Sequence, residues 1–179
     1  MQILTGKVAA SRVAGILDPK YQVHRFSVHL TARKIFSIDP TGQIDFGGSE
    51  YIAAGRMEIS PQRLRLEDKY QWWELKRGSY FVECNEALDL MENEIALIEP
   101  DERLLRTGAW HVPTYARGRV APVQLLLEVG AGQLRVKENA RLARFRLLRI
   151  TEDEESDHGL QKTESPKQKL AARKKATRR

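Results

Sequence analysis

The decapeptide EPDERLLRTG at residues 99–108 is the most informative segment of the chain. Its second half, from Leu104 to Gly108, is typical of a loop that leads into a turn and handles phosphate. Its first half places the carboxylates of Asp101 and Glu102 where such a loop usually carries donors. Guanidinium, hydroxyl and backbone N–H groups bind phosphate oxygens, whereas a carboxylate repels them. The segment therefore indicates a phosphate-handling scaffold whose anion-facing chemistry has been changed.

Short alternating segments surround this decapeptide from about residue 21 to residue 150. Apolar and polar residues alternate at 26–30 and 134–137, as they do in half-buried strands. We expect a turn at 76–79, an end to the strand 123–129 at Gly130–Gly132, and a last strand over 141–150. Many short strands separated by glycine and proline turns predict an all-β fold of the sandwich or barrel type.

The two ends of the chain differ from this pattern. Ile3, Val8, Val13 and Ile16 predict one apolar face of a short N-terminal helix, with Gly15 near its end. From residue 151 an acidic block is followed by a basic segment with few apolar residues, which predicts disorder. The sequence thus predicts a β domain over 1–150 and a disordered tail over 151–179.

Composition limits the classes of partner. The net charge of the 179 residues is +6, but the basic segment 166–179 holds seven Lys and Arg residues and no acid, so the rest carries −1. The tail, and not the body, is the candidate for binding nucleic acid or another acidic partner. Cys84 is the only cysteine, which excludes an intrachain disulfide and suits a cytoplasmic location. No apolar run approaches the roughly 20 residues that a membrane span needs, so no membrane association is expected.

Several separated motifs together resemble the dUTPase and dCTP deaminase superfamily, and the archaeal-type dUTPases in particular. In chain order the motifs are Leu30–Phe36, Gly42–Phe46, Gly78–Tyr80, Asn85–Glu86, Ala96–Ile98, Leu104–Gly108, Tyr115 with Gly118–Arg119, and Asn139–Leu142. The resemblance implies a jelly-roll-like β fold assembled as a homotrimer. It also implies sites at subunit boundaries that bind a deoxyribonucleoside triphosphate with Mg²⁺. In the dUTPases of the family, water attacks the α-phosphate and releases pyrophosphate.

Four positions depart from the motifs of that family. His29 stands where the first motif has an Asp, and Asp101 and Glu102 stand where the second has Arg and Ser. Val112 replaces the Asp that orients or activates water in the third motif, and it cannot accept a proton. The deaminase branch needs a Glu in the strand after the glycine, and residues 120–123 offer none. We therefore assign no catalytic residue.

The resemblance still implies nucleotide-binding roles for Arg103, Arg106, Tyr115 and Arg119. The alternative for the first two is a structural ion pair of each with Asp101 or Glu102. Tyr115 could pack against a deoxyribose, or it could be a core tyrosine at a strand end. Asn139 and Arg141 match a position near trimer contacts, where a structural role is favoured.

His24, His29 and His111 are the residues that could suggest a metal site, but histidines on strands are more often satisfied by hydrogen bonds, so we expect no protein-held metal.

The leading hypothesis is a homotrimer that binds a nucleotide without hydrolysing it, or acts as a regulatory scaffold; Mg²⁺ is expected only with bound nucleotide. An active dUTP diphosphatase could instead use Asp101 or Glu102 as metal ligand or base in a rearranged pocket. In a third hypothesis, the chain is an interaction module that uses the basic tail.

Overall fold

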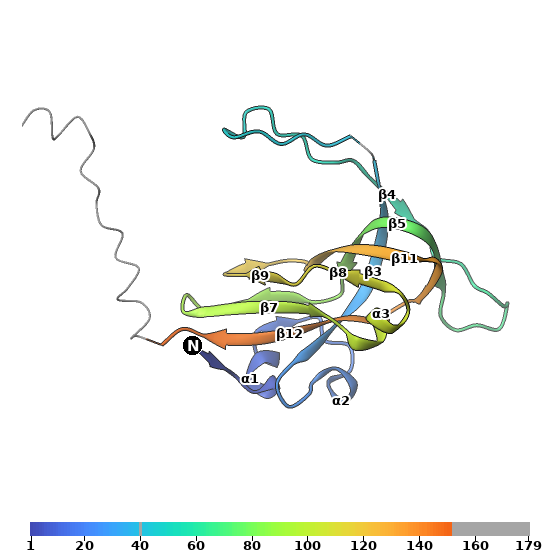
Figure 1. Ribbon diagram of the computed structural model, residues 1–179. Helices are drawn as coiled ribbons and strands as arrows, with labels where there is room; N and C mark the ends of the chain where they lie inside the picture. Colours follow the sequence, from blue (N-terminus) through green and yellow to red (C-terminus); the bar gives the residue numbers. More distant parts are fainter. Residues whose placement is uncertain (40, 152–179) are drawn as a thin grey trace, which may run out of the picture.

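The computed structural model describes residues 1–39 and 41–151 of the chain (Figure 1). The predicted tail lies outside these residues except for Thr151. The first half contains β1 (Gln2–Ile3), α1 (Gly6–Ala10), β2 (Val13–Ala14), α2 (Pro19–Gln22), β3 (Val28–Ile38), β4 (Arg56–Ile59), β5 (Trp72–Cys84) and β6 (Ala87–Asp89). The second half contains β7 (Glu94–Pro100), α3 (Glu102–Arg106), β8 (Ala109–His111), β9 (Thr114–Ala116), β10 (Arg119–Val120), β11 (Gln124–Lys137) and β12 (Arg141–Arg149).

The described strands form a large curled sheet and a small one. The large sheet has the order β8-β11-β5-β3-β12-β7-β9, with β1 added to β12 and β4 added to β3. The small sheet has the order β10-β6-β2. Neighbouring strands are antiparallel throughout the described residues. The all-β prediction is confirmed, and so is the last strand at 141–149.

The glycines that the sequence suggested as strand ends lie inside long strands instead. The predicted turn at 76–79 is wrong, because β5 runs unbroken from Trp72 to Cys84, and β11 likewise continues through Gly130–Gly132. Val129 pairs with Gly78, and the next pair joins Gln133 to Lys76, so β11 holds extra residues at a bulge. Gly78 has φ +149°, which other residues rarely adopt. The glycines therefore bend a paired ribbon and do not end it.

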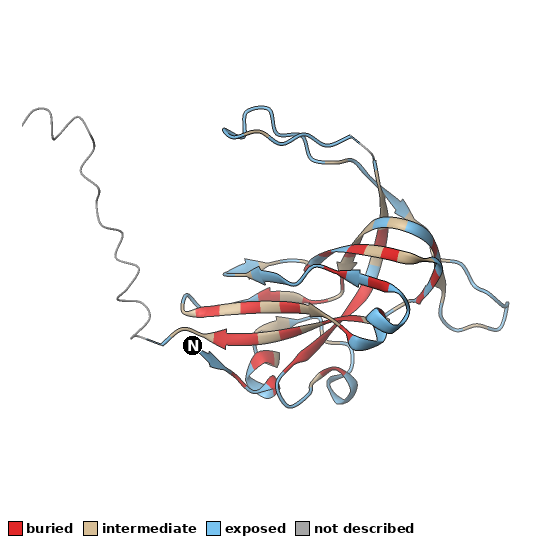
Figure 2. Ribbon diagram, viewed as in Figure 1, coloured by how far each residue is buried: buried red, intermediate tan, exposed pale blue. Residues whose placement is uncertain are grey.

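The core lies between the layers of the curled sheet, where alternate residues of each strand point inward (Figure 2). Its largest fully buried side chains include Leu30, Ile35, Leu75, Leu127 and Phe145. In β12, the core positions Phe145 and Leu147 alternate with the half-buried Arg144 and Arg146. This alternation leaves Arg144 and Arg146 on the other face of the strand.

The short N-terminal helix is present as α1, but its buried face is not the predicted one. Gly6 and Ala9 are its buried residues, whereas Val8 is exposed. Ile3 and Val13 lie in strands before and after it. A single helical turn is too short for the expected four-residue stripe, so pairing with β12 and β6 determines the flanking residues. Within the part of the chain that the structure describes, no helix is long and apolar enough to cross a membrane.

Candidate functional site

The decapeptide at 99–108 contains a short helix where the sequence suggested a loop. The side chain of Asp101 accepts a hydrogen bond of 2.9 Å from the backbone N–H of Arg103 and so caps the N-terminus of α3. Leu104 is buried against the core, and Gly108, at φ +75°, allows the chain to leave the helix in the left-handed conformation. The capping acid therefore has a structural reason for its place.

The Asp101 carboxylate is also the centre of a buried charge cluster. It is 3% exposed. Oδ1 lies 3.2 Å from Arg103 Nε, while Oδ2 lies 3.3 Å from His29 Nε2 and 3.5 Å from Arg144 Nε. Burial alone would raise the pKa of Asp101, but the hydrogen bonds from Arg103 and the charges around it lower the pKa. Asp101 is thus ionised and fully engaged by cations and a histidine.

His29, the residue at the first altered position, is held on β3 beside this carboxylate. Its ring centroid lies 4.4 Å from that of His24. Burial lowers the pKa of His29 to about 4, although the charge of Asp101 acts in the opposite direction. His29 is therefore neutral at pH 7. Its Nδ1 is buried and has no hydrogen-bond partner among the described residues.

Glu102 behaves differently from Asp101. Its side chain points into solvent, 61% exposed, and forms an ion pair with Arg106 one turn along α3. The structural ion pairs considered from the sequence are thus present within one chain, Arg103 with Asp101 and Arg106 with Glu102. Neither carboxylate is left unpaired to oppose an anion.

A hollow of about 440 Å³ opens beside this cluster. Three arginines line it, Arg103 from α3 and Arg141 and Arg144 from β12, together with His24, Ser27, His29, Asp101 and Glu102. Arg144 Nε is buried without a hydrogen-bond partner among the described residues. Because both lining carboxylates are already paired, the hollow retains a surplus of positive charge. It is suited to an anion such as phosphate.

A protein-held Mg²⁺ does not fit this donor set. Magnesium requires oxygen ligands, usually carboxylates, in octahedral geometry. The buried carboxylate here is occupied by two arginines and a histidine, and the remaining lining cations would repel the ion. Among the described residues, no group of three or more His, Cys, Asp or Glu side chains is placed to hold a metal. His111 lies on β8, where burial lowers its pKa and its Nδ1 faces the Val112 carbonyl oxygen.

The other predicted site residues lie apart from this hollow within one chain. Val112 is 67% exposed, and Tyr115, on the edge strand β9 opposite Leu97, is 69% exposed, so Tyr115 is not a core residue here. Arg119 is exposed in the small sheet, where it lies opposite Asp89 in the register of β10 with β6. None of the three lines the hollow beside Arg103. One chain therefore brings together His29, Asp101, Glu102 and Arg103, but neither Tyr115 nor Arg119.

Sequence reasoning missed Arg144 and gave Arg141 only a structural role. The alternation of β12 is a signal that Arg144 and Arg146 share a face. The alternation does not tell which residues the two arginines contact. The register of β12 with its neighbours supplies this information, since it places Arg144 between His29 on β3 and Glu99 on β7.

No family model matches the chain. The chain is similar to the probable deoxyuridine 5'-triphosphate nucleotidohydrolase of Methanosarcina acetivorans, with 27% identity over 158 residues that cover 84% of this chain and 86% of the relative. A protein of the same name from Methanosarcina mazei is 27% identical over 157 residues, 83% of this chain and 85% of that one.

The fold is similar to the crystal structure of the 2'-deoxycytidine 5'-triphosphate deaminase of Agrobacterium tumefaciens, with a TM-score of 0.61 and 17% identity. This match covers 83% of the chain but only 48% of the deaminase, so the chain spans about half its length. Ordered sequence motifs, the curled antiparallel sheet and the archaeal relatives agree with one another. The resemblance to the dUTPase and dCTP deaminase superfamily that the sequence motifs suggested is therefore confirmed.

Proposed function

We propose that this protein binds the phosphate groups of a deoxyribonucleoside triphosphate without hydrolysing them. The observation that carries the proposal is the engagement of Asp101, whose carboxylate caps α3 and contacts His29, Arg103 and Arg144. A carboxylate used in this way neither holds a metal nor takes a proton from water. The adjacent arginines remain available to donate to phosphate oxygens.

The residues that could activate water are poorly suited to that role. Val112 has no titratable group. His29 accepts a proton only near pH 4 because burial lowers its pKa, and a general base is most effective when its pKa lies near the working pH. Binding therefore has support in the arginine-lined hollow, while turnover lacks an evident base.

A homotrimer completes the proposal. Tyr115 and Arg119 lie away from the hollow in their own chain, and a boundary between subunits is the place where the family resemblance puts the two parts of a site together. We propose the cytoplasm as its location, which the single free and buried Cys84 suits.

Calorimetric titration with dUTP, dCTP and dTTP in the presence of Mg²⁺ tests binding, and pyrophosphate release in the same mixtures tests turnover. Arg144→Gln should weaken binding, since it removes a donor from the hollow. The matched control is Arg33→Gln, which changes an exposed arginine of β3 that pairs with Glu83 and does not line the hollow. The binding proposal fails if no nucleotide produces heat, and the non-hydrolysing proposal fails if pyrophosphate accumulates.

An active dUTP diphosphatase is the second candidate, because both archaeal relatives are named as probable enzymes of that class. Glu102 is the carboxylate it would use, being the one with access to solvent. Pyrophosphate release that disappears in Glu102→Ala but persists in the exposed control Glu74→Ala would favour this candidate.

The third hypothesis, an interaction module that uses residues 166–179, concerns a segment outside the described residues. Replacing its seven Lys and Arg residues by Ala in the full chain tests it. Binding to single-stranded DNA at low salt that is unchanged by this replacement would remove the hypothesis.

A further inference from the structure

An apolar arm extends from the body between β3 and β4. We define the arm as residues 41–55, which follow the last β3–β4 pair at Ile38 and Arg56. Its two limbs are joined by the mutual backbone hydrogen bonds of Gln43 and Ile52, both 2.9 Å. Figure 1 shows the arm running clear of the sheet, and Figure 2 shows it almost entirely exposed.

The arm carries more apolar surface than an isolated hairpin should. Four of its large side chains are exposed: Ile44 by 86%, Phe46 by 110%, Tyr51 by 61% and Ile52 by 57%. A two-stranded hairpin is marginally stable in water on its own, and a contiguous exposed apolar patch commonly marks an interaction surface. The arm also holds two acids, Asp45 and Glu50, and no Lys or Arg. Its partner should therefore be apolar and cationic.

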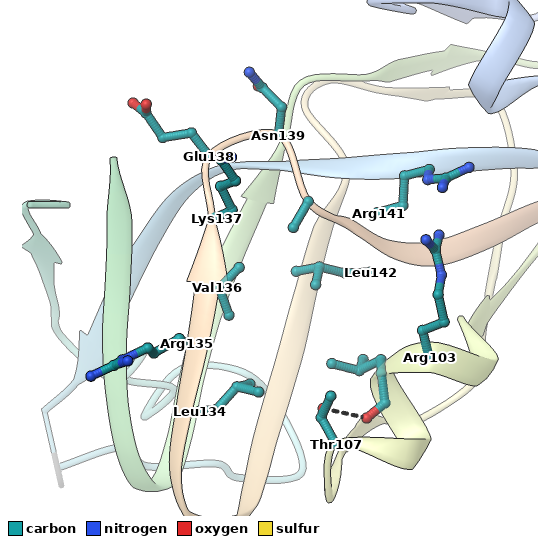
Figure 3. A pocket seen from close by; sticks show the side chains of 12 residues that line it. Arg103, Thr107, Leu134, Arg135, Val136, Lys137, Glu138, Asn139, Arg141 and Leu142 are labelled. Atoms are coloured by element: carbon teal, nitrogen blue, oxygen red, sulfur yellow. Dashed lines mark hydrogen bonds between the residues drawn. The ribbon is translucent and has the colours of Figure 1, made fainter. Parts of the chain in front are cut away.

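A surface of that kind lies around the turn between β11 and β12. Two hollows of about 560 and 340 Å³ share Lys137, Glu138, Asn139 and Arg141, and we call them together the β11–β12 groove. The larger is bordered by the exposed rings of Tyr21 and Tyr70. The smaller has a floor of Leu134, Val136 and Leu142 (Figure 3).

The charge of the groove complements the charge of the arm. Its lining cations are Arg103, Arg135, Lys137 and Arg141, and its lining carboxylates are Asp18 and Glu138. Four cations against two carboxylates give the lining a formal surplus of two positive charges. Arg103 and Arg135 are paired with Asp101 and Glu74, which leaves Lys137 and Arg141 as the lining cations that can meet the acids of the arm.

We propose that the arm of one copy of this chain lies in the β11–β12 groove of a second copy. Each limb of the arm has about six or seven residues and so reaches about 20 Å when extended. The arm runs clear of its own body (Figure 1), which places it where a second copy can reach it. The arm and the groove are different surfaces, so the contact between copies is head-to-tail. Such a contact closes into a ring when the rotation that relates neighbouring copies is a whole fraction of a full turn. The arm then covers the apolar part of the cleft next to Arg103, which adds a neighbour's residues to the site.

Cross-linking of engineered cysteines tests the contact directly. Cys84 is buried, and burial raises the pKa of its thiol, so it will not compete. Full-length Phe46→Cys and Lys137→Cys proteins, carrying tags of different mass, are mixed and mildly oxidised. We expect a disulfide between the two chains. In the control mixture, Lys137→Cys is replaced by Thr114→Cys, an exposed residue of β9 outside the groove. No excess of cross-linked product over the control would overturn the proposal.

The mass in solution provides a second test. Replacing residues 43–52 by a short Gly-Ser turn should lower the molar mass seen by light scattering, with an unchanged circular dichroism spectrum. Glu50→Lys should weaken association about fivefold, and Lys137→Glu in the same chain should restore part of the loss. An unchanged mass without the arm would overturn the proposal. Neither test involves a nucleotide, so the outcome is independent of the proposed function.

Discussion

Glu94 and Asp101 are buried carboxylates at the two ends of β7, and each meets an arginine of β12. Glu94 accepts hydrogen bonds from Arg12 Nε at 2.8 Å, from a terminal nitrogen of Arg149 at 2.9 Å and from the Met91 N–H at 3.1 Å. These bonds connect the N-terminal segment to the large sheet. Burial alone would raise the pKa of Glu94, but the hydrogen bonds lower it to about 2.

Asp101 shares its charge with a neutral histidine and lies beside an arginine-lined hollow. The same arrangement, a carboxylate with arginines on β12, thus occurs in two different surroundings. At Glu94 the donors converge on the acid and hold two segments together. At Asp101 the acid contacts two arginines beside the hollow that, in the proposed function, receives phosphate.

The largest expected effect is on Glu94, because its loss leaves Arg12 and Arg149 without their partner. Glu94→Ala should lower the free energy of unfolding by about 3–5 kcal/mol. Glu74→Ala, which removes an exposed partner of Arg135, should cost less than about 1 kcal/mol. Urea denaturation followed by circular dichroism measures both. Equal losses would show that burial does not distinguish the two ion pairs.

Acidification should separate the two ends of β7 by pH. His29 has a folded pKa of about 4 and a reference value of 6.5, so the unfolded chain binds its proton first and stability falls as the pH drops from 6.5 to 4. The loss is on the order of 3 kcal/mol. Glu94, with a folded pKa of about 2 against 4.5, loses its contribution only between pH 4.5 and 2.

His29→Gln should therefore remove most of the fall in the free energy of unfolding between pH 6.5 and 4. Burial also lowers the pKa of His111, which contributes in the same direction, so His111→Gln should remove part of the remainder. Denaturation curves at half-unit intervals of pH measure the slopes. An undiminished slope in His29→Gln would show that the histidine is not buried beside Asp101.

Asp101→Ala should cost about 2–3 kcal/mol, since it removes the cap of α3 and the acid between Arg103 and Arg144. Asp101→Asn keeps an oxygen that can cap the helix, so it should cost about 1 kcal/mol less. Thermal and urea unfolding compare the two variants. If Asn were as damaging as Ala, the charge and not the cap would be the main contribution.

Arg144→Gln should affect binding more than stability. We expect nucleotide affinity to fall about tenfold, because one charge-assisted donor to phosphate is lost. The free energy of unfolding should change by less than about 1 kcal/mol, since Asp101 keeps Arg103 and His29. Calorimetry on Arg144→Gln and on the Arg33→Gln control gives the comparison, and equal affinities would remove Arg144 from the site.

The smallest effect belongs to Glu102 and Arg106. Their ion pair is exposed on one face of α3, so Glu102→Ala should cost only about 0.3–0.5 kcal/mol. That small cost should disappear at high salt, where screening removes the interaction. A cost above about 1 kcal/mol that survives high salt would indicate a contact with a second chain.

Much of the fold could be predicted because strand formation is a local property. Alternation identified the segments around Leu30 and Leu134, and a mostly apolar run identified the last strand at 141–150; all three are strands in the structure. Glycines were the main source of error. Gly78 lies opposite Val129, and Gly130 follows Val129 in the bulge of β11, so the paired strands continue where an isolated chain would turn. The pairing partner is not visible in a local window.

The sequence alone determined the all-β class, the resemblance to the superfamily and the altered positions His29, Asp101, Glu102 and Val112. These features depend only on the order of the residues, which does not change with the conformation of the chain. Only the tertiary structure decided that Asp101 turns inward as a cap while Glu102 points to solvent, and that Arg144 lies beside His29. The period of a strand determines which face a side chain takes, but the register between distant strands determines which group it meets.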